Sequence, residues 1–145
     1  MRRVDQDMAG QAAEILHGVD VTADLRTRYR TLRVMAHTSG LAATYAYVAS
    51  KSTGRDRDRA EAYRHVRDGI GTRMAGLGLV PRPDSTDPRA VLTALGDMDT
   101  VDYLKASSQV TDLLGWLARL ADAIVADRGP ADGGPATSGT GTGDG

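Results

Sequence analysis

The last third of the chain carries a repeat of mostly apolar residues that continues without a break over three heptads. Spacings of four and three residues alternate along it, which places its members on one face of an α-helix. They are Tyr103, Ser107, Val110, Leu114, Leu117, Ala121 and Ile124, and the face is widened by Leu113, Trp116 and Leu120. The repeat predicts a helix of about 26 residues that starts near Thr100 and has an apolar face wide enough for the centre of a bundle.

Five shorter patterns precede this repeat, and each predicts a helix. We expect helices over about 4–18, 22–38, 41–51, 60–77 and 88–96. In the second, every other residue from 26 to 30 is basic, which also fits a strand. A strand would place Leu32 with the arginines, however, whereas helical spacing joins it to an apolar row that comprises Leu25, Tyr29, Leu32 and Ala36.

Polar residues at the predicted helix starts fit the role of N-caps. Thr22 or Asp24 precedes the second helix, Ser39 the third, and Asp87 precedes a proline at the first position of the fifth. Gly69 and Gly71 interrupt the fourth helix, and each is expected to weaken it by about 1 kcal/mol relative to Ala.

Composition agrees with an all-α fold packed mainly by aliphatic side chains. The chain of 145 residues contains no Phe, and Ala, Leu and Val dominate its apolar residues. We expect a compact bundle of about five to six helices in a single domain over residues 1–127. Residues 128–145 are rich in Gly, Pro and Thr and are expected to be disordered. No apolar run reaches the length of a membrane span, and the absence of Cys fits a cytoplasmic protein.

No arrangement of residues in the sequence predicts an active site. The three histidines, His17, His37 and His65, fall on separate predicted helices without metal-ligand spacing. Only two glutamates are present, which does not fit a carboxylate-rich metal centre in a bundle. We therefore expect a protein that is not an enzyme and that has no metal site and no cofactor.

Charge is distributed unevenly, although the formal net charge is only −1. Residues 26–73 contain 11 basic and 4 acidic side chains, a net charge of +7. Arg26, Arg30 and Arg33, hereafter the arginine row, share one helical face about 100° from the apolar stripe, and Arg28 points elsewhere. A solvated helix face is one interpretation of this row. Contact with phosphates is the other, and the scarcity of carboxylates one helical turn away favours it.

Trp116 also has two interpretations. It lies beside the apolar stripe of the last helix, on a face with Lys105 and Arg119. A tryptophan in that position commonly forms the edge of the core. If it is partly exposed, it is a suitable anchor for a partner subunit.

Three segments resemble a known family. They are RRVDQDMAGQAAEIL, YRTLRVMAHTSGLAATYAYVASKS and DYLKASSQVTDLLGWLARLADAIV. In order and character they are similar to the small helical subunit of the type III-B CRISPR effector, the fifth member of the Cmr set. The resemblance spans residues 2–127, matches poorly over about 52–98 and excludes the Gly-rich tail.

The resemblance implies a non-catalytic structural subunit of a ribonucleoprotein in antiviral defence. Its expected partners are the other Cmr subunits, further copies of itself stacked along the guide-RNA filament, and the guide RNA–target RNA duplex, with no membrane. Basic positions that match groove-facing helices are Arg26, Arg30, Arg33, Lys51, Lys105 and Arg119. The alternative is a helical protein–protein adaptor that makes no direct contact with nucleic acid.

Overall fold

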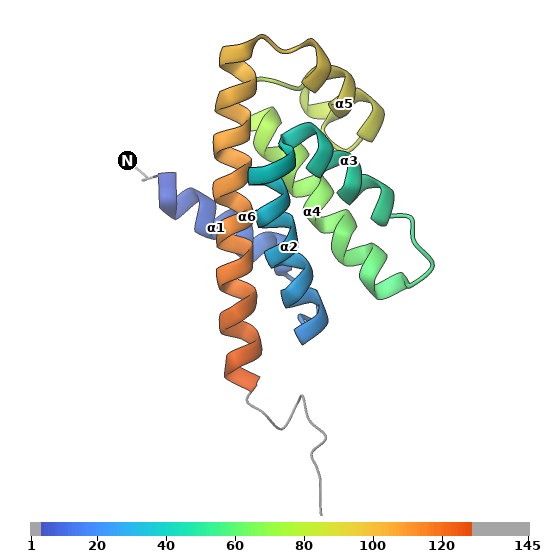
Figure 1. Cartoon of the computed structure of the whole chain (residues 1–145), viewed down its shortest axis with the longest axis vertical. Helices are drawn as coiled ribbons and strands as arrows, with labels where there is room; N and C mark the ends of the chain where they lie inside the picture. Colours follow the sequence, from blue (N-terminus) through green and yellow to red (C-terminus); the bar gives the residue numbers. More distant parts are fainter. Residues whose placement is uncertain (1–3, 129–145) are drawn as a thin grey trace, which may run out of the picture.

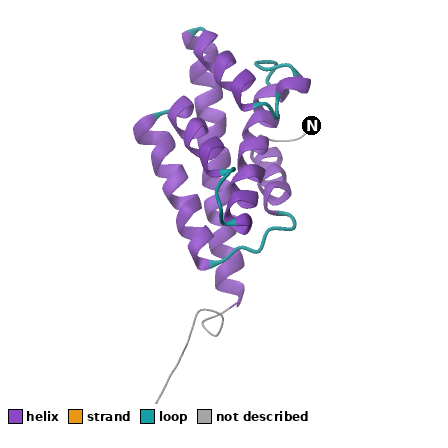
Figure 2. Ribbon diagram, turned by 90° about the vertical axis from the view of Figure 1, so that its right-hand side faces the viewer, coloured by secondary structure: helices purple, strands orange, loops and turns teal. Residues whose placement is uncertain are grey.

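Helices make up nearly all of the chain that the structure, a computed structural model, describes, which is residues 4–128. No strand occurs within that range (Figures 1 and 2). The elements are α1 (Val4–Leu16), α2 (Ala23–Ser39), α3 (Leu41–Lys51), α4 (Arg57–Gly76), a short 3₁₀ turn η1 (Arg82–Asp84), α5 (Pro88–Asp97) and α6 (Thr100–Arg128). The predicted all-α fold is confirmed. Disorder was predicted for residues 128–145, but Arg128 is the last residue of α6, and residues 129–145 lie outside the described range.

The long helix α6 forms the axis of the bundle. It has 29 residues, and it runs the length of the molecule with α1 and α2 packed along it (Figure 1). A second pair, α3 and α4, packs beside them, and α5 contacts α3 near the start of α6. The apolar repeat of α6 thus serves the central role that its width predicted.

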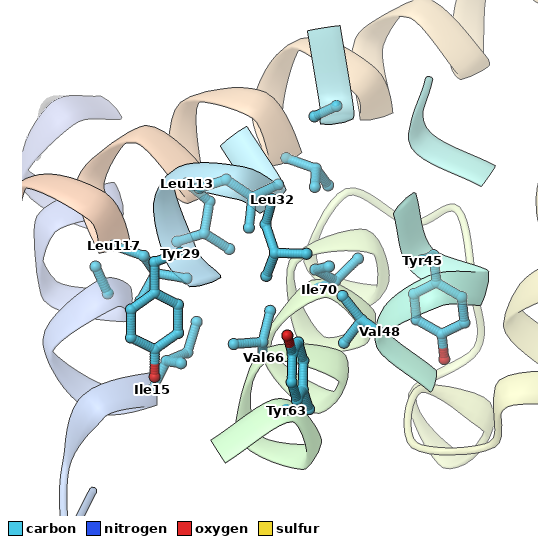
Figure 3. Close-up of a cluster of buried hydrophobic side chains, with 14 of the residues drawn as sticks. Ile15, Tyr29, Leu32, Tyr45, Val48, Tyr63, Val66, Ile70, Leu113 and Leu117 are labelled. Atoms are coloured by element: carbon cyan, nitrogen blue, oxygen red, sulfur yellow. The ribbon is translucent and has the colours of Figure 1, made fainter. Parts of the chain in front are cut away.

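The predicted apolar row of α2 is buried in full, which settles the choice between helix and strand. Leu25, Tyr29, Leu32 and Ala36 are all in the core. Figure 3 shows Tyr29 and Leu32 beside Leu113 and Leu117 of α6, with Val66 and Ile70 of α4 on the other side of the cluster.

Two of the three predicted side-chain caps are confirmed, those of α2 and α5. The Leu25 amide donates to Thr22 Oγ1 over 3.1 Å, so Thr22, and not Asp24, caps α2. Asp87 accepts from the Arg89 amide at the start of α5. At α4 the cap is Asp56, so this helix begins at Arg57, three residues earlier than predicted.

The predicted cap at Ser39 is wrong. Ser39 is the last residue of α2, and Gly40 alone joins α2 to α3, with a φ of 91° that favours glycine. No side chain at the junction caps α3. Instead, the Ala42 amide donates to the Tyr103 hydroxyl of α6 over 3.1 Å. Tyr103, which is distant in the sequence, therefore supplies the acceptor that was predicted to come from Ser39.

Gly69 and Gly71 are required by close packing around α4. An added Cβ at Gly69 would lie 2.4 Å from Ile15 Cδ1 of α1. At Gly71 it would lie 1.8 Å from the Ser85 carbonyl oxygen. Both glycines are buried. They lower the helix propensity of α4, but their lack of a Cβ allows α1 and the 81–87 segment to pack closely against it.

Candidate nucleic-acid interface

The arginine row lies along the contact between α2 and α6, where two of its members converge on Asp122. Arg30 Nη2 donates to Asp122 Oδ1 over 2.7 Å, and Arg26 Nε lies 3.9 Å from the same oxygen. An added Cβ at Gly115, two turns earlier on α6, would lie 3.8 Å from Arg33 Nε. The row therefore follows α6 in the antiparallel sense.

This placement follows from the angular layout of α2. Burial of its apolar stripe against the bundle places the arginine face, about 100° away, over the flank of α6. Asp122 is separated from Arg30 by 92 positions in the sequence, so it is not among the carboxylates that lie one helical turn from the row on α2. The sequence predicted that few carboxylates would neutralise the row, and this prediction is only partly correct, because Asp122 pairs with two of its members. Two guanidinium groups of the row contact Asp122 and the third, that of Arg33, lies near Gly115, so the three arginines and Asp122 together carry a formal charge of +2.

Lys51 lies beside two tyrosines of α3 and α4 and not with the arginine row. Its Nζ lies 5.5 Å from the centre of the Tyr47 ring, which makes an edge contact with the Tyr63 ring at 6.1 Å. Arg28 interacts with Tyr63 from the far side of α2 and lies 3.6 Å from Asp24. Burial, assisted by Tyr47, raises the pKa of Tyr63 to about 12, so its hydroxyl stays neutral at physiological pH.

Several other cations of the basic span serve the fold. Arg64 Nη2 and Arg67 Nη1 both donate to Ser52, at the carboxyl end of α3, over 3.3 Å. Arg73 donates to the side-chain oxygens of Gln11 and Gln109 and so links α4 with α1 and α6. The net charge of this span therefore overstates the positive surface available to a ligand.

The α6 candidates lie on the outer side of that helix. Trp116 is partly buried and packs against the core, and the Arg119 guanidinium lies 5.6 Å from the centre of its ring. Trp116 and Asp122 are about 120° apart around the helix, so Arg119 leans away from the arginine row. Lys105 is exposed 14 residues before Arg119, about 21 Å along the axis. The structure thus brings together the arginine row alone among the six proposed RNA-binding positions.

The described residues offer little that resembles a catalytic or metal centre. Within residues 4–128, no three His, Cys, Asp or Glu side chains are arranged to hold a metal ion. A cleft between the α1–α2 turn and the start of α4 is lined by five carboxylates, which repel phosphates: Asp20, Asp24, Asp56, Asp58 and Glu61. None of the helices in the described range is long and apolar enough to cross a membrane.

These features define a small helical-bundle protein with a row of arginines along the contact between α2 and α6. The family model described as CRISPR-associated protein (Cas_Cmr5) matches residues 2–124, and the chain belongs to this family of subunits of the type III-B CRISPR-Cas complex. It therefore takes part in a Cmr complex with other subunits. The match confirms the resemblance and extends through residues 52–98, where the resemblance was poor. No curated protein and no solved structure matches the chain.

Proposed function

We propose that the protein is a non-catalytic structural subunit of the type III-B effector that stacks along the guide-RNA filament and helps to bind target RNA through the arginine row. The observation that carries this proposal is the juxtaposition of Arg26, Arg30 and Arg33 on the α2–α6 flank, where Asp122 is their one ion-pair partner among residues 4–128. Such a surface attracts phosphates without reading the sequence of an RNA.

Backbone contact is sufficient for a subunit of an RNA-guided complex. In such complexes, base pairing between guide and target supplies the sequence information, and the protein recognises the duplex by its shape and backbone. Arg33 is exposed and makes no ion pair with any residue in the range 4–128, so its charge is available to a phosphate without rearrangement. Arg30 is 54% exposed, so it too can reach a ligand.

The test is capture of target RNA by the assembled complex with the arginine row neutralised. Glutamine is the better replacement, because glutamate would add carboxylates beside Asp122. We expect Arg26→Gln/Arg30→Gln/Arg33→Gln to weaken capture about tenfold or more at 150 mM salt, and to reduce the slope of log K against log salt by about two.

A matched control removes three positive charges elsewhere. Arg57, Arg82 and Arg89 are exposed and make no ion pair within the described part of the chain. Their triple change to Gln should leave both capture and salt slope within twofold of wild type. Equal capture and an equal slope for the arginine-row variant would exclude the role in RNA binding, provided that its far-UV circular dichroism is unchanged.

Exposed apolar side chains favour the second candidate function, a helical adaptor without direct nucleic-acid contact. Val101 and Leu104, in the first two turns of α6, are 74% and 63% exposed. Together with Trp116, they offer apolar contact area to a neighbouring subunit. The adaptor predicts that co-purification with Cmr subunits survives nuclease treatment and is weakened by Trp116→Ala. It also predicts that the arginine-row variant captures RNA as well as wild type does.

A further inference from the structure

Asp122 holds a position that the sequence did not single out, between α6 and the two arginines nearest to it. One of its oxygens, Oδ1, serves both guanidinium groups, at 2.7 Å from Arg30 and 3.9 Å from Arg26. The two interactions differ in kind. The shorter one is a charge-assisted hydrogen bond, and the longer one is an ion pair without a hydrogen bond.

Arg26 is consequently short of one acceptor. Its Nε is buried, yet it makes no hydrogen bond in the structure. A guanidinium carries five N–H donors, and a buried donor without an acceptor is costly. A second anionic oxygen beside Asp122 would supply that acceptor, and a phosphate offers several.

The bond between Asp122 and Arg30 is one that a ligand can displace. The side chains are 43% and 54% exposed, so water screens their attraction, and exposed ion pairs contribute little net stability. Asp122 also adds a negative charge to the surface that a phosphate must approach. Its removal would raise the formal charge of the cluster from +2 to +3.

From this geometry we infer that Asp122 is an intramolecular competitor for RNA phosphate, which occupies Arg26 and Arg30 in the free protein and limits their affinity for the RNA backbone. The inference rests on the proposed function, because it assigns a regulating residue to the same surface. Bound phosphate takes the place of the carboxylate at Arg30, and once the Arg26 side chain turns outward the phosphate supplies the acceptor that Arg26 Nε lacks. Arg33 makes no ion pair with any residue from 4 to 128, so it forms the first contact.

The opposite role, in which Asp122 positions the arginines for RNA, predicts the opposite sign. A positioning carboxylate would fix both guanidinium groups by hydrogen bonds, and its loss would weaken binding. Here the Arg26 interaction is too long for a hydrogen bond, and Arg30 is on the surface. Competition therefore describes the geometry better than positioning does.

The experiment compares four forms of the full chain in the assembled complex with guide RNA: wild type, Asp122→Asn, Arg30→Gln and the double variant Asp122→Asn/Arg30→Gln. Target RNA binding is measured over a series of KCl concentrations. Asp97→Asn supplies a control of equal charge change, because Asp97 is exposed at the end of α5 and makes no ion pair within the described residues.

We expect Asp122→Asn to tighten target RNA binding about two- to fivefold at low salt, in line with the strength of an exposed ion pair. In the Arg30→Gln background the gain should be smaller, about twofold or less, because the hydrogen-bonded pair is already absent and the longer Arg26 pair alone remains. Asp97→Asn should bind as wild type does. A high concentration of KCl should reduce the gain, since salt screens both charges.

Three results would overturn the inference. One is unchanged or weaker binding by Asp122→Asn. Another is a gain of equal size in Asp97→Asn, which would indicate a general effect of net charge. The third is a gain that is undiminished in the Arg30→Gln background. If Asp122→Asn has no effect while neutralising the arginine row weakens capture, only the competitor role fails, whereas no effect from either set of variants removes the proposed RNA-binding function as well.

Discussion

For Gly71→Ala, helix propensity and the packing in the structure predict opposite changes in the free energy of unfolding. By helix propensity alone, Gly71→Ala should stabilise α4 by about 1 kcal/mol. The added Cβ, however, would lie 1.8 Å from the Ser85 carbonyl oxygen and 2.9 Å from the Ser85 carbonyl carbon. An ordinary C···O contact is about 3.3 Å or longer, so the two backbones would have to separate by about 1.5 Å.

The segment that must move is held by its own hydrogen bonds. The Ser85 amide donates to the Arg82 carbonyl over 3.1 Å, and the Asp87 amide to the Asp84 carbonyl over 3.0 Å. Overpacking of this kind typically costs 1–3 kcal/mol, and a backbone obstacle places the cost toward about 3 kcal/mol. After subtraction of the propensity gain, we expect Gly71→Ala to reduce the free energy of unfolding by about 2 kcal/mol.

Gly10→Ala is the matched control. Gly10 lies in the interior of α1, and an added Cβ there would meet nothing within 4 Å. The same chemical change should therefore raise the free energy of unfolding by about 0.5–1 kcal/mol. Urea denaturation followed by far-UV circular dichroism measures both values, and the m-value should stay constant if only stability changes. A Gly71→Ala protein as stable as wild type, alongside a stabilised Gly10→Ala protein, would refute the close approach of Ser85.

Three further predictions concern single polar groups. Tyr103→Phe should lower the free energy of unfolding by about 1 kcal/mol in urea denaturation, because the Ala42 amide loses its acceptor. Burial raises the pKa of Tyr45 to about 12, and its hydroxyl makes no hydrogen bond to any residue from 4 to 128. The stability that depends on the neutral hydroxyl should therefore be complete below pH 10 and decline as the pH rises towards 12. Denaturation across that range should show a shallower decline for Tyr45→Phe, without loss at pH 7. Thr22→Ala should cost about 1 kcal/mol by the same assay, because the Leu25 amide loses its cap.

The helices and most of their buried faces could be predicted from the sequence, because the spacing of apolar residues within one helix is a local property. The row from Leu25 to Ala36 and the repeat of α6 needed no knowledge of neighbouring elements. The predicted start of α4 missed a local cap, Asp56, whereas the failure at the start of α3 involves a distant partner. Ser39 looked like a cap because serine commonly is one, whereas the Tyr103 hydroxyl, 61 positions from Ala42, does that work.

The candidate site was predictable in its residues but not in its electrostatics. Helical spacing alone grouped Arg26, Arg30 and Arg33 on one face. The rotation of α2 about its own axis relative to α6 determines which carboxylate that face contacts. The pattern of residues within α2 does not predict this rotation. For the same reason the sequence did not separate Lys51 from the row, since that separation depends on how Tyr47 and Tyr63 bring α3 and α4 together.

The net charge of a segment is therefore a poor measure of a nucleic-acid footprint in a helical bundle. Arg64, Arg67 and Arg73 contribute to the +7 of residues 26–73, yet each donates hydrogen bonds that join one helix to another. Their removal would lower RNA capture by loosening the bundle, whether or not they touch RNA. The arginine row differs, because Arg30 and Arg33 are exposed, and among residues 4–128 the row forms ion pairs with Asp122 alone. A loss of capture in variants of the row, with stability unchanged, is thus evidence about RNA, whereas the same loss in Arg64 or Arg67 variants is not.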